Sequence, residues 1–82
     1  MNPLTDEQRR FAVAVLSQDL MRAYELVKSD KNASGTPLGP QGRNELMDYI
    51  GRLRDVLKAL GMTQAQLDQI AEQFGPAIYK VN

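Results

Sequence analysis

Only a few side chains in this sequence have the type and spacing for chemistry. Asp68 and Glu72 stand four residues apart, so both carboxylates lie on one face if the segment is a helix, and no basic residue lies within that segment. Such a pair could bind a cation or dock on a basic partner. Two carboxylates make a poor metal site, however, because hard cations take six or more oxygen ligands. A solvated acidic face is the simpler interpretation.

The chain contains neither cysteine nor histidine. Disulfides and thiolate nucleophiles are therefore excluded, and so are the usual zinc and iron ligands and the side chain best suited to proton transfer near neutral pH. The acids elsewhere stand mostly beside basic residues, as on a solvated surface. We therefore expect no catalytic residues, no metal site and no cofactor, and we predict that the protein is not an enzyme.

Nucleic-acid binding has two possible carriers in the sequence. Residues 40–60 form the most basic segment, but acids are interleaved among its basic residues, which are Arg43, Arg52, Arg54 and Lys58. The run "QIAEQFGPAIYKVN" could begin a helix-turn-helix, yet only seven residues follow Gly75 and the first is a proline. A recognition helix needs two to three turns of polar or basic side chains. A transcriptional regulator with a degenerate helix-turn-helix-like C-terminus is thus the alternative hypothesis.

The charge balance gives no long-range attraction to nucleic acid or to an anionic membrane. Ten Lys and Arg stand against ten Asp and Glu, for a formal net charge of zero. The start, "MNPLTDEQRR", has acids where a signal peptide would be basic, and the apolar run "FAVAVL" is too short to span a membrane. The sequence predicts a soluble, cytoplasmic protein without a membrane partner.

The elements that would position these side chains are three helices, expected over 6–28, 40–60 and 64–74. Thr5 with Gln8, and Thr63 with Gln66, have the spacing of capping boxes at two of the helix starts. A Gly/Pro-rich linker covers 29–39 and a short tail covers 75–82. Pro37 in the linker and Pro40 just after it favour a semi-extended linker, which either only connects two antiparallel helices or offers a loop to a partner. The fold class is all-α, with residues 1–82 as one helical domain.

Apolar residues recur at helical spacing and predict the buried stripes. The stripes contain Ala12, Val13, Leu16, Leu20, Ala23, Tyr24 and Val27 in the first helix, Leu46, Ile50, Leu53, Leu57 and Leu60 in the second, and Leu67, Ile70, Ala71 and Phe74 in the third. Ser17 is expected on the polar side of the first helix. Gly51, inside the second, suggests a close approach by another backbone.

The lengths of the helices favour association. The first two helices would be about 35 and 30 Å long and the third only about 17 Å, so part of the hairpin lacks a covering helix. We therefore predict a homodimer that completes a helical bundle, although a monomer covered by the linker and tail is an alternative. The expected contact residues are apolar or large and lie off the stripes or in the tail: Phe11, Val15, Leu26, Tyr49, Arg52, Val56, Ile78 and Tyr79.

The functional hypothesis follows from these exclusions. The protein would be a non-enzymatic protein–protein interaction module that regulates or inhibits a larger protein by binding it. A small helical protein without catalytic residues is also compatible with a gene carried by a mobile element such as a phage.

Overall fold

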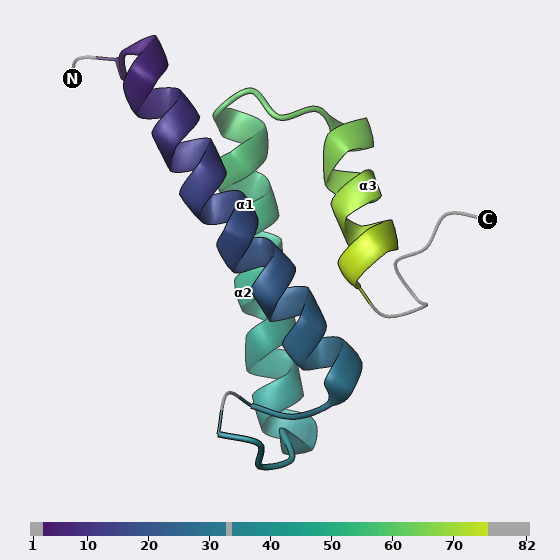
Figure 1. Cartoon of the computed structure of the whole chain (residues 1–82). Helices are drawn as coiled ribbons and strands as arrows, with labels where there is room; N and C mark the ends of the chain where they lie inside the picture. Colours follow the sequence, from purple (N-terminus) through teal and green to yellow (C-terminus); the bar gives the residue numbers. More distant parts are fainter. Residues whose placement is uncertain (1–2, 33, 76–82) are drawn as a thin grey trace.

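The computed structural model describes residues 3–32 and 34–75, which fold into three helices. They are α1 (Asp6–Ser29), α2 (Gly39–Ala59) and α3 (Gln64–Phe74). α1 and α2 run in opposite directions, and α3 turns back to run in the same direction as α1 (Figure 1). Both α2 and α3 pack against α1. The prediction of an all-α protein with two long helices and one short helix is confirmed, and no described helix is long and apolar enough to cross a membrane.

The helix boundaries follow from local chemistry. At the start of α1 the Thr5 Oγ1 accepts a hydrogen bond from the Gln8 amide at 3.1 Å, and the Gln8 side chain accepts one from the Thr5 amide at 3.0 Å. Thr63 and Gln66 make the same pair of bonds at α3. These capping boxes satisfy amide groups that have no partner inside the helix. Both predicted capping boxes are thus present, and the predicted boundaries differ from the observed ones by one residue at most.

The linker between α1 and α2 is a compact closed loop. Asn32 Oδ1 accepts hydrogen bonds from the backbone amides of Ser34 and Thr36, at 3.0 and 3.1 Å. The Leu38 amide donates to the Asp30 carbonyl at 3.1 Å, next to an antiparallel bridge between Lys31 and Pro37. The expected semi-extended linker was therefore wrong, because an asparagine side chain that bonds to the following backbone folds the segment back on itself.

The core lies where the three helices face one another. Its members come from the predicted stripes of all three helices: Leu20, Ala23, Tyr24, Val27, Ile50, Leu53, Leu57, Leu67 and Ala71. Tyr24 is the largest fully buried side chain. Gly75 ends α3 directly against it, and a Cβ at Gly75 would lie 2.6 Å from the Ala71 carbonyl oxygen and 3.2 Å from Tyr24 Cδ1. Only glycine therefore fits at the end of α3 without a shift in the backbone.

Two positions in the helices differ from the sequence-based expectation. Ser17 is buried, not solvated, because it precedes Tyr24 by seven residues and so lies about 20° from it around α1. Its Oγ has no hydrogen-bond partner among the described residues. Gly51 is exposed, and no heavy atom lies within 4 Å of the Cβ that a larger residue would add. The expected close approach of a backbone at Gly51 was wrong.

Candidate functional site

Four large apolar side chains of α1 and α2 are exposed. Their exposed fractions are 71% for Phe11, 48% for Val15, 43% for Tyr49 and 47% for Val56. All four belong to the contact residues expected from the sequence. We call these four residues the apolar face. Leu4, just before α1, is also exposed.

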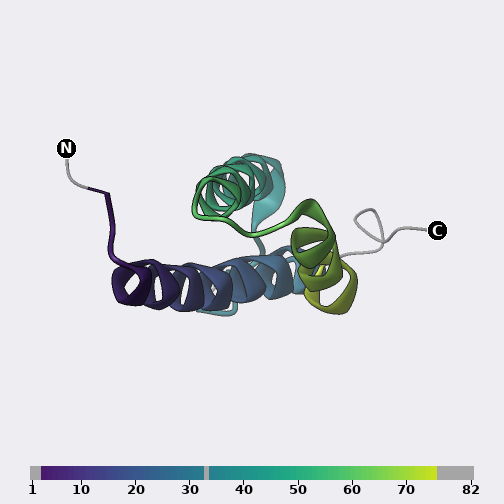
Figure 2. The same ribbon diagram turned by 90° about the horizontal axis from the view of Figure 1, so that it is seen from above.

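The apolar face lies on the side of the hairpin away from α3. Val15 and Tyr24 are nine residues apart, so they point in opposite directions from α1, about 180° apart. Tyr49 and Arg54 are separated by about 140° on α2 for the same reason. Tyr24 and Arg54 are the residues that reach toward α3, as the hydrogen bonds below show. The first turns of α1 also project beyond α2 and α3 (Figure 2).

A polar contact fixes Tyr49 within this face. Its hydroxyl donates a hydrogen bond to Asp19 of α1, and Asp19 also pairs with Arg22 at 2.5 Å. The hydrogen bond to Asp19, together with partial burial and the negative charge of Asp19, raises the pKa of Tyr49, and Arg22 offsets part of this effect. The neutral hydroxyl is therefore favoured, and its bond to Asp19 links α2 to α1 beside the exposed ring.

Two other predicted contact residues border the apolar face. Leu26 is half-buried, and therefore less accessible than we expected; it lines a groove of about 390 Å³ together with Leu38, Leu46 and Tyr49. Arg52 is exposed and has no ion pair within 4.0 Å in the described part of the chain. It lines a depression of about 280 Å³ with Glu45, Asp48 and Tyr49. The remaining predicted residues, Ile78 and Tyr79, lie outside the described residues.

A hydrogen-bond network joins all three helices on the opposite side of the hairpin. Arg54 of α2 donates to the Tyr24 hydroxyl at 2.7 Å and to Asp68 Oδ1 of α3 at 3.1 Å. Gln64 also donates to Asp68 Oδ1, at 2.9 Å. These bonds from Gln64 and Arg54 lower the pKa of Asp68. Burial opposes the charge of Arg54, but its bonds to Tyr24 and Asp68 outweigh this, and its pKa is raised.

This network corrects the interpretation of the acidic pair. Asp68 was expected to lack a compensating charge, but it has one in Arg54, which lies on another helix across the tight turn between α2 and α3. No spacing pattern within one helix could have revealed that pair. Glu72 is exposed and forms no ion pair with any described residue. Residues 3–32 and 34–75 contain no group of three or more acidic, histidine or cysteine residues arranged to hold a metal.

The structure also limits what the basic segment can bind. Arg43 donates to the Val27 carbonyl at 3.1 Å and to Asp30 at 3.3 Å. Arg43 and Arg54 are thus engaged inside the molecule, which leaves Arg52 as the arginine of α2 without an ion pair to the described residues. Phosphate binding relies on several accessible cations, and in this segment only Arg52 and Lys58 are exposed without an ion pair to the described residues.

Comparison with protein-family models, with curated proteins and with solved structures finds no match. The functional argument therefore depends on the surface itself.

Proposed function

We propose that this protein is a non-enzymatic protein–protein interaction module whose apolar face is its main contact surface. The observation that carries the proposal is the exposure of Phe11, Val15, Tyr49 and Val56 on one side of the hairpin. Large exposed apolar surfaces on soluble proteins mark interaction sites, and each Å² buried yields about 25 cal/mol. A contact that covers a few hundred Å² of this face would add several kcal/mol to a small domain.

The partner that covers the apolar face is a second copy of the chain. Two-fold dimers are the commonest oligomers, and their interfaces are self-complementary. Arg52 stands on this face beside Glu45 and Asp48, so the face carries both positive and negative charge. A two-fold axis through the face brings Arg52 of one protomer toward the acids of the other. α1 and α2 of each protomer then pack together as a four-helix bundle, which a single chain leaves incomplete.

Sedimentation equilibrium tests this dimer. We expect the wild-type chain at tens of micromolar to have twice the monomer mass of 9.2 kDa. Val56→Asp places a charge in the apolar face and should give the monomer mass. Gln73→Asp adds the same charge on an exposed position of α3 and should leave the dimer intact. A wild-type mass of 9.2 kDa that does not change with concentration refutes the dimer.

As a dimer, the module regulates or inhibits a larger protein by binding it. The sequence contains neither cysteine nor histidine, which favours action by binding over catalysis. Nucleic acid has less support as the target, because Arg43 and Arg54 are already engaged. Affinity capture from the host's lysate should retain one protein at a fixed ratio to the module. Capture by the wild type that is no stronger than capture by an unrelated helical protein contradicts this role.

A further inference from the structure

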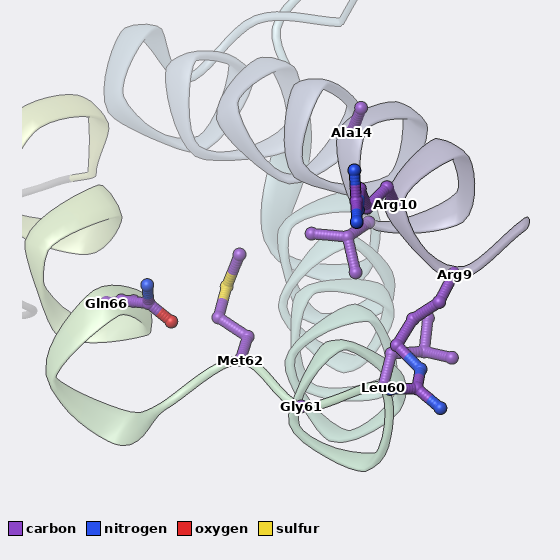
Figure 3. Close-up of a pocket in the computed structure, with 8 residues that line it drawn as sticks. Arg9, Arg10, Ala14, Leu60, Gly61, Met62 and Gln66 are labelled. Carbon is purple, nitrogen blue, oxygen red and sulfur yellow. The ribbon is translucent and has the colours of Figure 1, made fainter. Parts of the chain in front are cut away.

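A second surface, on the other side of α1, is an open groove of about 320 Å³. It lies between the first half of α1 and the turn that connects α2 to α3 (Figure 3). Its lining residues are Arg9, Arg10, Val13, Ala14, Leu60, Gly61, Met62 and Gln66. Met62 points into the space between α1 and α3, and Gln66 faces it from α3 (Figure 3). We call this space the corner groove.

The corner groove combines an apolar floor with a basic rim. Val13, Leu60 and Met62 are half-buried and supply the floor. Arg10 stands at the edge and forms no ion pair within 4.0 Å with any residue in 3–32 or 34–75. Arg9 pairs only weakly with Asp6, at 4.0 Å and with both side chains at least half exposed. A ligand that fits this surface presents apolar groups flanked by negative charge.

The arrangement of the helices favours an elongated ligand. α3 has 11 residues and α1 has 24, and the first turns of α1 project beyond the start of α3 (Figure 1). The corner groove lies at this step, where residues of the first half of α1 face the turn that precedes α3 (Figure 3). A further helix placed there would pack on α1 as α3 does. Amphipathic helices bind such grooves through apolar side chains spaced along one face.

We propose that the corner groove binds an acidic amphipathic helix of the larger protein. The apolar side chains of that helix cover Val13, Leu60 and Met62, and its flanking carboxylates pair with Arg10 and Arg9. This inference rests on the proposed function, because it assumes a protein target. It uses a different side of α1 from the apolar face, since Arg10 and Val15 point about 140° apart. Val56 lies on α2 and does not line the groove, so a substitution there separates dimer formation from helix binding.

The test is fluorescence anisotropy with the full chain and a labelled synthetic peptide. The peptide is a helix with leucines at i, i+3, i+4 and i+7 and glutamates beside them, and a second peptide replaces every glutamate with lysine. We expect saturable binding of the acidic peptide at micromolar concentrations and at least about tenfold weaker binding of the lysine peptide. Arg10→Glu should weaken binding of the acidic peptide by about three- to tenfold.

Three further variants make the result decisive. Lys31→Glu makes the same charge change in the loop at the other end of the molecule and should not alter binding. Ala14→Gln inserts a polar side chain at the groove and should weaken binding, with unchanged helix content by circular dichroism. Val56→Asp should abolish the dimer and keep the peptide affinity, so the two proposals can fail separately.

The proposal is overturned if the acidic peptide shows no saturable binding. Equal losses for Arg10→Glu and Lys31→Glu would also overturn it, since they would indicate attraction by net charge alone. Saturable binding of decanoate without binding of the peptide would reassign the groove to small amphipathic carboxylates.

Discussion

Replacing Tyr24 with phenylalanine removes one hydroxyl from the network that joins the three helices. The Tyr24 side chain is fully buried, and its hydroxyl accepts a hydrogen bond from the Arg54 guanidinium at 2.7 Å. Tyr49→Phe removes the same group from a tyrosine that is 43% exposed and bonds to Asp19. The two substitutions are chemically identical, so their difference reports the effect of the surroundings.

The expected magnitudes differ clearly. A hydrogen bond to a charged group contributes about 1.5–3 kcal/mol. Arg54 is partly exposed and keeps its bond to Asp68, so we expect Tyr24→Phe to cost the lower part of this range, about 1.5–2 kcal/mol. In Tyr49→Phe, water can replace the lost hydroxyl as the partner of Asp19, so we expect the free energy of unfolding to change by no more than about 0.5 kcal/mol. For a domain of this size, 1 kcal/mol shifts Tm by about 4–8 °C.

The assay is urea unfolding followed by circular dichroism, in the Val56→Asp background so that dimer formation does not contribute to stability. Tyr24→Phe should lower the unfolding midpoint at an unchanged m-value, and Tyr49→Phe should leave it nearly unchanged. Equal effects, or a larger effect at Tyr49, would show that the Arg54 network does not fasten the three helices.

The remaining predictions concern stability at single positions, each measured by urea or thermal unfolding. Gly51→Ala should raise the free energy of unfolding by up to about 1 kcal/mol, because the site is exposed and open. Gly75→Ala should lower it by about 1–3 kcal/mol, because the added Cβ would meet the Ala71 carbonyl. Effects of the same sign at the two positions would contradict this reasoning. Ser17→Ala should raise the free energy of unfolding by about 1 kcal/mol, since it removes a buried hydroxyl without a partner among the described residues. A loss of stability would instead indicate that the hydroxyl has a hydrogen-bond partner. Because the pKa of Asp68 is lowered from 3.8, its charge stabilises the fold above that pH, and the contribution is lost as pH falls through the lowered pKa. The Tm of the wild type should therefore fall more steeply than that of Asp68→Asn between about pH 5 and pH 2, and parallel curves would contradict it.

The helices could be predicted from sequence because their signals are local. Thr5 and Thr63 each act on a residue three positions away, and Gly61, with φ 108°, follows the end of α2 where left-handed backbone is needed. The spacing of Ile50, Leu53 and Leu57 gives the buried side of α2 directly. Phe11, Val15, Tyr49 and Val56 could be identified as exposed because they fall beside these stripes.

The sequence could not reveal features that depend on contacts between elements. The pairing of Arg54 with Asp68 requires the turn after α2 to place α3 beside Tyr24. The corner groove likewise forms from Arg10 and Val13 of α1 together with Met62, which are distant in sequence. The position of Ser17 was misjudged for another reason: its polarity suggested solvent, although its spacing from Leu20 and Tyr24 is that of the buried stripe. Periodicity was the better guide there than side-chain polarity.

The central claim, that the apolar face is covered in the assembled protein, is tested most directly by thiol labelling. The chain has no cysteine, so Val56→Cys and Gln73→Cys each introduce one reactive site. Alkylation rates are measured for both variants across a range of protein concentrations. We predict that the rate at position 56 falls as concentration rises and copies associate, while the rate at position 73 stays constant. Rates at position 56 that remain constant over the whole range and match those at position 73 would contradict the account.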